Sequence, residues 1–156
     1  MVDAQSGHEK TITSMLPALA GANVIYGLGM LEMGITFDLA QLVLDHEIAG
    51  MVLHSLNGIV VNDETLSVDV IRELGIGKDY MSHESTYKHM KSQSQAQIID
   101  RRMREDWEAA GSTDAYKRAH ERVIEILETY EPAPLPANVL NTIRSIVEEA
   151  EKELVR

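Results

Sequence analysis

The sequence predicts a mainly α fold that contains one to three short strands. Apolar residues recur every three or four positions along most of the 156 residues, which is the spacing of one helix face. Capping residues and glycines divide these stretches into helices of ordinary length. Only residues 23–26, Asn-Val-Ile-Tyr, combine β-branched side chains with flanking glycines, which is typical of a short buried strand.

The composition indicates an acidic protein with an aliphatic core. Hydrophobic residues make up 44% of the chain and aromatic residues only 4%, so Leu, Ile, Val, Met and Ala must supply the core. The absence of cysteine excludes disulfides and thiolate metal sites. The chain shows neither the basic and apolar regions of a signal peptide nor an apolar run that would span a bilayer. We therefore expect a cytoplasmic protein without membrane segments.

The charge is unevenly distributed along the chain. The formal net charge is −11, and residues 1–71 contain a single cation, Lys10, against nine acidic residues. Binding to phosphates needs clustered Lys and Arg, so we expect no nucleic-acid partner. A solvated acidic surface is the simpler explanation of the imbalance, and a cationic small substrate for the first half is the alternative.

The first part of the chain is expected to place a strand between two helices. Asp3 is positioned to cap the first helix. The strand at residues 23–26 leads into a glycine-spaced loop that carries a lone acid, Glu32. Thr36 then caps a long apolar helix that runs to about Leu56.

The middle of the chain has shorter elements. Residues 59–61 form a second short strand or an extended link, and Asp63 caps a short helix. Residues 79–81 are the candidate for a third strand. The polar, histidine-rich residues 82–89 form a loop or a helical turn.

The last part of the chain is predicted to form three helices. The first carries Ile99, Met103 and Trp107 on one face, and Thr113 caps the second. The third follows a stiff proline-rich connector at residues 132–136.

Several common sites are excluded by spacing. Residues 27–32, GLGMLE, begin like a dinucleotide fingerprint, but Glu32 replaces the third glycine and would lie against the pyrophosphate. His83 and His89 are six residues apart, so they face different sides of a helix and do not form a helical zinc pair. Residues 45–47, Asp-His-Glu, are better explained as a solvated or ion-paired helix face than as a metal site. We therefore predict no metal site.

Eight segments carry a resemblance to a known family. They are DAQSGHEK (residues 3–10), AGANVIYG (20–27), GMLEMGITF (29–37), QLVLD (41–45), DETL (63–66), DVI (69–71), HESTYKH (83–89) and DRRMREDW (100–107). Together they resemble the carboxyl-terminal third of the trimethylamine:corrinoid methyltransferase family. In detail the resemblance is closest to the non-pyrrolysine branch that includes the glycine betaine methyltransferases, and it covers nearly the whole chain.

The resemblance implies a TIM-barrel enzyme. Its members move a methyl group from a methylamine or quaternary amine, such as trimethylamine or glycine betaine, to the Co(I) corrinoid of a separate partner protein. Residues 1–91 would be the closing βα units of the barrel, and residues 92–156 a helical extension of three helices. A barrel needs ~250 residues, so the barrel is incomplete in this chain, and we expect a shortened gene or an excised fragment. No directly bound cofactor is expected.

The implied chemistry suggests candidate substrate-binding residues but no catalytic residue. The enzyme must hold a methylated cation, exclude water and aim one methyl group. Aromatic faces and carboxylates bind such cations, so Tyr26 and Glu32 are candidates, while Gly27 and Gly29 allow close approach of the backbone. The alternatives are that Glu32 only caps or pairs structurally and that Tyr26 is a core residue.

A second set of candidates depends on the third strand. If residues 79–82 end the last barrel strand, then His83, Thr86 and His89 lie at the same rim. There they would bind a substrate carboxylate or meet the corrinoid protein. The alternative is that both histidines are hydrogen-bonded loop residues.

Two functions therefore compete at this stage. In the first, the chain contributes the closing part of a corrinoid-dependent methyltransferase. In the second, it is a catalytically inactive, truncated helical remnant that acts only through self-association or protein binding. The apolar helix that ends near Leu56 favours a partner in either case, so we expect a homo-oligomer as well as a corrinoid protein partner.

Overall fold

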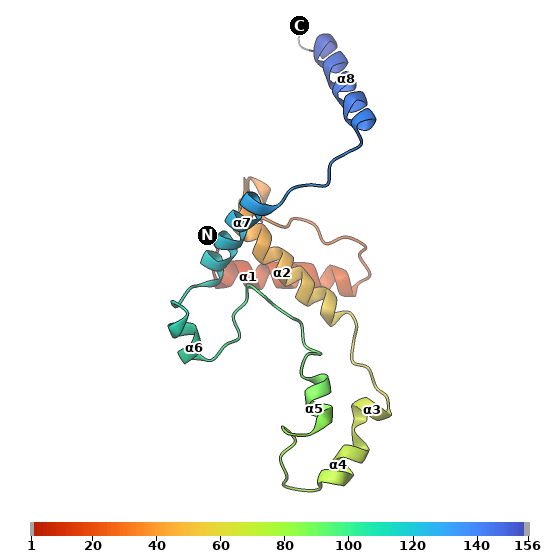
Figure 1. The fold of residues 1–156 in the computed structure, drawn as a ribbon, viewed down its shortest axis with the longest axis vertical. Helices are drawn as coiled ribbons and strands as arrows, with labels where there is room; N and C mark the ends of the chain where they lie inside the picture. The colour runs from red at the N-terminus through yellow and green to blue at the C-terminus, as the bar shows by residue number, and fades with distance from the viewer. Residues whose placement is uncertain (1, 155–156) are drawn as a thin grey trace. The chain divides into compact units, whose positions relative to one another are not determined.

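The chain is mainly helical, as the sequence predicts. The computed structural model describes residues 2–154, and within them it contains eight α-helices, one two-stranded sheet and one 3₁₀ turn (Figure 1). By its internal contacts the chain forms two compact units, Met1–Ile124 and Glu125–Arg156. No helix within residues 2–154 is long and apolar enough to cross a membrane. The division predicted at residue 91 stays a prediction.

Helix α1 (Ala4–Leu19) begins at the predicted cap. Asp3 Oδ1 accepts a hydrogen bond from the Ser6 backbone N–H at 3.1 Å, which satisfies one of the free donors at the helix start. Pro17 is tolerated in the last turn, and its carbonyl oxygen accepts from the backbone N–H of Ala22 at 2.9 Å. The helix therefore begins as expected.

A β-hairpin occupies the glycine-spaced stretch after α1. β1 (Met30–Leu31) pairs antiparallel with β2 (Thr36–Phe37), with the first residue of β1 opposite the last residue of β2. The turn η1 (Glu32–Gly34) joins them, and Glu32 and Met33 have left-handed φ angles of 51° and 54°. Such a conformation costs about 1–3 kcal/mol per non-glycine residue, so surrounding contacts must hold it.

The strand predicted at residues 23–26 is wrong. These residues are irregular, and their backbone groups make no hydrogen bond to any other described residue. A β-branched segment forms a strand only where a second strand supplies hydrogen-bond partners, and residues 2–154 supply none here. The same reason applies to residues 59–61, which form an irregular link, and to residues 79–81.

Helix α2 (Leu39–Ser55) is capped two residues later than predicted. Asp38, not Thr36, caps it, because Asp38 Oδ1 accepts from the backbone N–H of Gln41 at 2.8 Å and Thr36 belongs to β2. α2 packs against α1. It contributes both apolar and polar buried residues, which are Ala40, Gln41, Leu44, Asp45 and Val52. Ala119 of helix α7 (Ala115–Thr129) completes the core cluster with Ala40 and Leu44.

Three short helices follow α2. They are α3 (Asp63–Leu66), α4 (Val68–Leu74) and α5 (Glu84–His89). Asn62 rather than Asp63 caps α3, and it forms a reciprocal capping box with Thr65. The polar residues 82–89 are thus mostly a helical turn, one of the two structures expected for them.

Helix α6 (Arg104–Ala109) is shorter than the periodicity of Ile99, Met103 and Trp107 predicts. The residues before it are held by side chains instead. Arg101 donates to the Ser94 carbonyl oxygen at 2.5 Å. Asp100 accepts from both the backbone and the guanidinium of Arg102, and these hydrogen bonds lower the pKa of Asp100 to about 2.

The last two helices are α7 (Ala115–Thr129) and α8 (Ala137–Leu154). The first turn of α7 is closed by Asp114, which accepts from the backbone N–H of Lys117 at 2.7 Å, rather than by Thr113. α8 follows the irregular proline-rich connector and buries none of its described residues.

Candidate functional site

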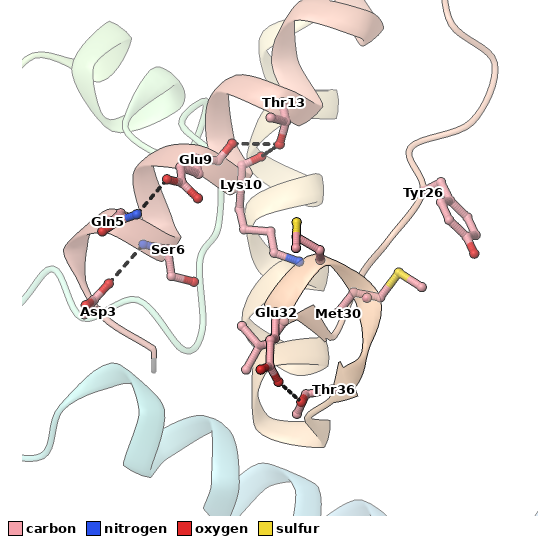
Figure 2. A pocket seen from close by; sticks show the side chains of 13 residues that line it. Asp3, Gln5, Ser6, Glu9, Lys10, Thr13, Tyr26, Met30, Glu32 and Thr36 are labelled. Atoms are coloured by element: carbon pink, nitrogen blue, oxygen red, sulfur yellow. Dashed lines mark hydrogen bonds between the residues drawn. The ribbon is translucent and has the colours of Figure 1, made fainter.

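A groove with a volume of about 880 Å³ lies between α1 and the hairpin (Figure 2). One side of α1 forms its first wall, because Asp3, Ser6, Lys10 and Thr13 are three or four residues apart and share a helix face. The hairpin residues 30–34 and Thr36 form the second wall, and Tyr26 lies at the edge. The groove is therefore built around the stretch that the sequence singles out.

Among the described charged residues that line the groove, carboxylates outnumber the single ammonium of Lys10. Asp3, Glu9 and Glu32 contribute three carboxylates, and their hydrogen-bond donors are neutral groups of the chain. Glu32 Oε2 accepts from the Thr36 hydroxyl at 2.9 Å across the hairpin (Figure 2). A neutral donor does not cancel the charge of a carboxylate. The carboxylates of the groove are therefore able to attract a small cation.

Lys10 extends from α1 toward the hairpin (Figure 2). Its ammonium donates to Asp45 Oδ2 at 2.9 Å and to the carbonyl oxygen of Gly27 at 3.0 Å. The same Asp45 oxygen accepts from the Gly29 backbone N–H at 2.8 Å. The Lys10–Asp45 ion pair therefore holds the loop at residues 27–29 against both α1 and α2.

Asp45 is a buried acidic side chain between α1 and α2. Its side chain is 4% exposed, and its second oxygen accepts from Gln41 Nε2 at 2.6 Å. A buried carboxylate is stable only when it is paired and hydrogen-bonded, and Asp45 has one cation and two further donors. The ion-paired interpretation of residues 45–47 is confirmed for this residue.

The two candidate glycines have different tasks. Gly27 presents its carbonyl oxygen to Lys10. Gly29 is buried with φ +77°, and a Cβ there would lie 2.8 Å from the Phe37 ring and 3.0 Å from Leu42 Cβ. Only glycine fits this conformation and this space.

Tyr26 is not a core residue. Its side chain is 84% exposed, and its ring points away from Glu32 and from the side chains of α1 (Figure 2). Tyr26 also borders a second hollow of about 370 Å³ that is lined by Lys10, Gly27 and Asp45. Tyr26 and Glu32 thus share the groove without touching.

The histidine candidates line a different hollow. His83 and His89 border a space of about 410 Å³ between α3, α4 and α5, and neither lines the groove that contains Tyr26 and Glu32. His83 Nδ1 accepts from the Ser85 backbone N–H at 3.1 Å and so caps α5. His89 Nδ1 lies 2.8 Å from the Ser85 carbonyl oxygen. Both histidines therefore make the local hydrogen bonds of the structural alternative.

Two further polar groups near this hollow, Thr86 and Glu64, are also paired. Thr86 donates to the Tyr80 carbonyl oxygen at 2.6 Å. The carboxylate of Glu64 lies between Lys88 and His89, and the Lys88 ammonium holds the pKa of Glu64 below its ordinary value. Within residues 2–154, no three His, Asp or Glu side chains are grouped so that they could hold a metal ion.

Comparison with known proteins decides the family. The sequence model of the trimethylamine methyltransferase family (MTTB) matches residues 1–155. The chain belongs to this family. A trimethylamine methyltransferase of Desulfitobacterium hafniense is 55% identical over 151 residues, which are 97% of this chain and 30% of that protein. One from Methanosarcina mazei is 45% identical over 96% of this chain and 30% of its own length.

A second kind of relative belongs to the same comparison. A glycine betaine methyltransferase of Desulfitobacterium hafniense is 29% identical over 98% of this chain, which corresponds to 32% of that protein. The chain thus spans about a third of the length of the relatives it matches. It corresponds to the carboxyl-terminal part of trimethylamine methyltransferases, as the resemblance predicts.

Sequence reasoning missed the buried part of this candidate site. It considered Asp45 only within a helix face, and it gave no role to Lys10 or Gln41. One signal was available: Lys10 is the single cation of residues 1–71, and Asp45 interrupts an apolar helix. A carboxylate in such a helix needs a partner, and only one cation of this region could supply it.

Proposed function

We propose that this chain is the carboxyl-terminal part of a cytoplasmic methyltransferase that transfers a methyl group from a methylated amine to the Co(I) corrinoid of a partner protein. The single observation that carries the substrate side is the carboxylate-lined groove between α1 and the hairpin. Trimethylamine in its protonated form and glycine betaine both carry a methylated ammonium group. The higher identity to trimethylamine methyltransferases favours the first of these substrates.

The residues of this chain would bind and orient the cation. Glu32 supplies the negative charge from the rigid hairpin turn, and Tyr26 supplies an aromatic face at the groove edge. The corrinoid supplies a strong nucleophile for the methyl carbon. The methyl group itself carries no acidic proton that must be removed, so orientation and exclusion of water are the tasks left to the protein.

We infer a TIM-barrel context from the irregular residues 23–26. Val24 and Tyr26 are 71% and 84% exposed, and the backbone between them makes no hydrogen bond to other described residues. A β-branched segment of this kind is suited to pair with neighbouring strands supplied from outside this chain. In this proposal residues 1–91 form closing βα units and residues 92–156 the helical extension.

Methyl transfer by a chimera tests the proposal. The upstream part of the Desulfitobacterium hafniense trimethylamine methyltransferase is joined to this chain and mixed with reduced corrinoid protein and trimethylamine. The absorbance of the corrinoid then reports transfer. We expect transfer by the chimera and none by the 156-residue chain alone, and glycine betaine serves as the alternative substrate. A folded chimera that transfers from neither amine would contradict the proposed function.

The substitution Glu32→Gln in the chimera tests whether the Glu32 carboxylate binds the substrate cation. Loss of one charge contact of about 1–2 kcal/mol should raise KM for trimethylamine about five- to thirty-fold. Glu148→Gln in α8 is the matched control, since it removes the same charge from an exposed residue that is not part of the groove lining. Equal KM values for the two variants would exclude Glu32 from substrate binding.

A further inference from the structure

The ammonium of Lys10, which borders the groove, is bound by Asp45 and by the backbone of Gly27. Among the described residues that line the groove, Lys10 carries the only amine side chain, and its Nζ lies 2.9 Å from Asp45 Oδ2 and 3.0 Å from the Gly27 carbonyl oxygen. The Lys10 side chain is 22% exposed. The positive charge of Lys10 is therefore paired with Asp45 next to the loop at residues 27–29.

The pairing of Lys10 with Asp45 determines the charge that the groove presents to a ligand. The groove walls retain the carboxylates of Asp3, Glu9 and Glu32, whose hydrogen-bond partners within residues 2–154 are neutral donors. An ammonium close to a carboxylate near a protein surface is attracted to it more strongly than in bulk water. A released Lys10 would be an internal counter-ion for these carboxylates, and it would compete directly with a bound cation.

We propose that Asp45 determines the charge specificity of the groove by sequestering the Lys10 ammonium. Held in this way, Lys10 fixes the glycine loop but leaves the carboxylates open to a methylated ammonium substrate. The inference rests on the proposed function and deepens it, because it names a positioning residue that acts on the substrate through Lys10. Asp45 itself lies outside the groove lining.

Geometry supports sequestration as well as packing. Asp45 places both of its oxygens in hydrogen bonds, one to Gln41 Nε2 and one shared by Lys10 and the Gly29 N–H. An Asn side chain at this position retains an acceptor for the Gly29 N–H but loses the charge that holds Lys10. The charge and the loop contact can therefore be separated by substitution.

The test compares three forms of the full chain: wild type, Asp45→Asn, and Asp45→Asn combined with Lys10→Met. Methionine keeps most of the apolar stem of lysine and removes its charge. The probe is tetramethylammonium chloride, titrated by NMR chemical-shift changes, and tert-butanol is the neutral probe of similar shape. Circular dichroism reports whether each form is folded.

We expect Asp45→Asn to weaken tetramethylammonium binding about tenfold or more and the double variant to restore it to within about threefold of wild type. Binding of tert-butanol should stay the same in all forms. A purely structural role of Asp45 predicts a different result, in which both probes bind more weakly and removal of Lys10 restores neither. That result would overturn the inference.

A second measurement keeps the inference testable if Asp45→Asn is unstable. Reductive methylation followed by mass spectrometry gives the labelling rate of Lys10 relative to the exposed Lys78. Under native conditions we expect slow labelling of Lys10 in the wild type and several-fold faster labelling in Asp45→Asn. Equal labelling rates of Lys10 in the wild type and in Asp45→Asn would overturn the inference.

The inference and the proposed function fail in different ways. A chimera that transfers methyl groups equally well with and without the substitution Asp45→Asn leaves the proposed function intact and overturns the inference. Failure of the wild-type chain to bind tetramethylammonium also overturns the inference. Failure of the chimera to transfer from any amine contradicts the proposed function alone if charge-selective binding persists.

Discussion

At the scale of single residues, Gly29 joins the hairpin to α2. It lies in a left-handed conformation, its N–H donates to Asp45, and a Cβ would be 2.8 Å from the Phe37 ring. Gly29→Ala should therefore lower the free energy of unfolding by about 1–3 kcal/mol, through backbone strain and the clash with Phe37. Urea denaturation followed by circular dichroism measures this change.

Gly50 provides the matched control within α2. A Cβ at Gly50 meets no atom within 4 Å, and the residue lies inside a helix. Gly50→Ala should raise the free energy of unfolding by about 0.5–1 kcal/mol, because alanine loses less backbone entropy in a helix. A Gly29→Ala variant as stable as Gly50→Ala would show that the loop relaxes freely.

At the scale of elements, α2 uses carboxylates to hold distant segments. Glu47 Oε1 accepts from the backbone N–H groups of Ile98 and Ile99 at 2.6 and 2.8 Å. On the other side of that segment, Arg118 Nε donates to the Ile98 carbonyl oxygen at 2.8 Å. Helix α2 and helix α7 thus fix one irregular segment from both sides.

Replacing Glu47 should release this segment. Glu47→Ala leaves two backbone donors without their acceptor, which should cost about 1–3 kcal/mol, and the amides of Ile98 and Ile99 should exchange with solvent about ten- to a hundredfold faster. Hydrogen exchange by NMR gives the measurement. Glu47→Gln retains the oxygen and is the control. Unchanged exchange in Glu47→Ala would mean that Arg118 alone holds the segment.

The carboxylate that caps α2, Asp38, has a partner on α7. The Tyr116 hydroxyl donates to Asp38 Oδ2 at 3.0 Å, and this hydrogen bond, together with the negative charge of Asp38, raises the pKa of Tyr116 above its ordinary value. The stabilisation from this contact is complete below the ordinary tyrosine pKa near 10 and is lost as the pH rises through the raised pKa.

The sequence predicts those features of the fold that depend on residues close together in the chain. The cap at Asp3 and the helical periodicity of α2 and α8 depend on residues within a few turns, and they are present in the structure. The strand at residues 23–26 depends on partners elsewhere, so propensity alone predicted it wrongly. Contacts such as Glu47 to Ile98 connect residues 51 positions apart, and no pattern in the sequence specifies them.

The candidate site shows the same limit. Glu32 and Tyr26 were found because a lone acid and an aromatic residue stand in a glycine-spaced stretch, and the structure places both on one groove. The role of Lys10 could not be predicted from spacing, because its partner Asp45 lies 35 residues away. The histidines are predicted at the rim only if a strand ends at residues 79–82, but these residues form no strand and the histidine ring nitrogens make local contacts with Ser85.

At the scale of the whole molecule, many large apolar side chains are exposed. In the unit Met1–Ile124, Val24, Ile35 and Ile59 are 71%, 79% and 92% exposed. The relatives are about three times as long as this chain. Exposed apolar surface of this extent favours association, either with the corresponding upstream sequence or between copies of the chain.

We therefore expect the chain alone to self-associate as its concentration rises, as measured by size-exclusion chromatography with light scattering. Val24→Thr replaces a methyl group by a hydroxyl of the same shape on an exposed side chain, so it should reduce association and change the free energy of unfolding by less than about 0.5 kcal/mol. Val52→Thr is the matched control, because Val52 is 1% exposed. Burying its hydroxyl should cost about 1–3 kcal/mol without reducing association. A monomer at every concentration would contradict association through this surface.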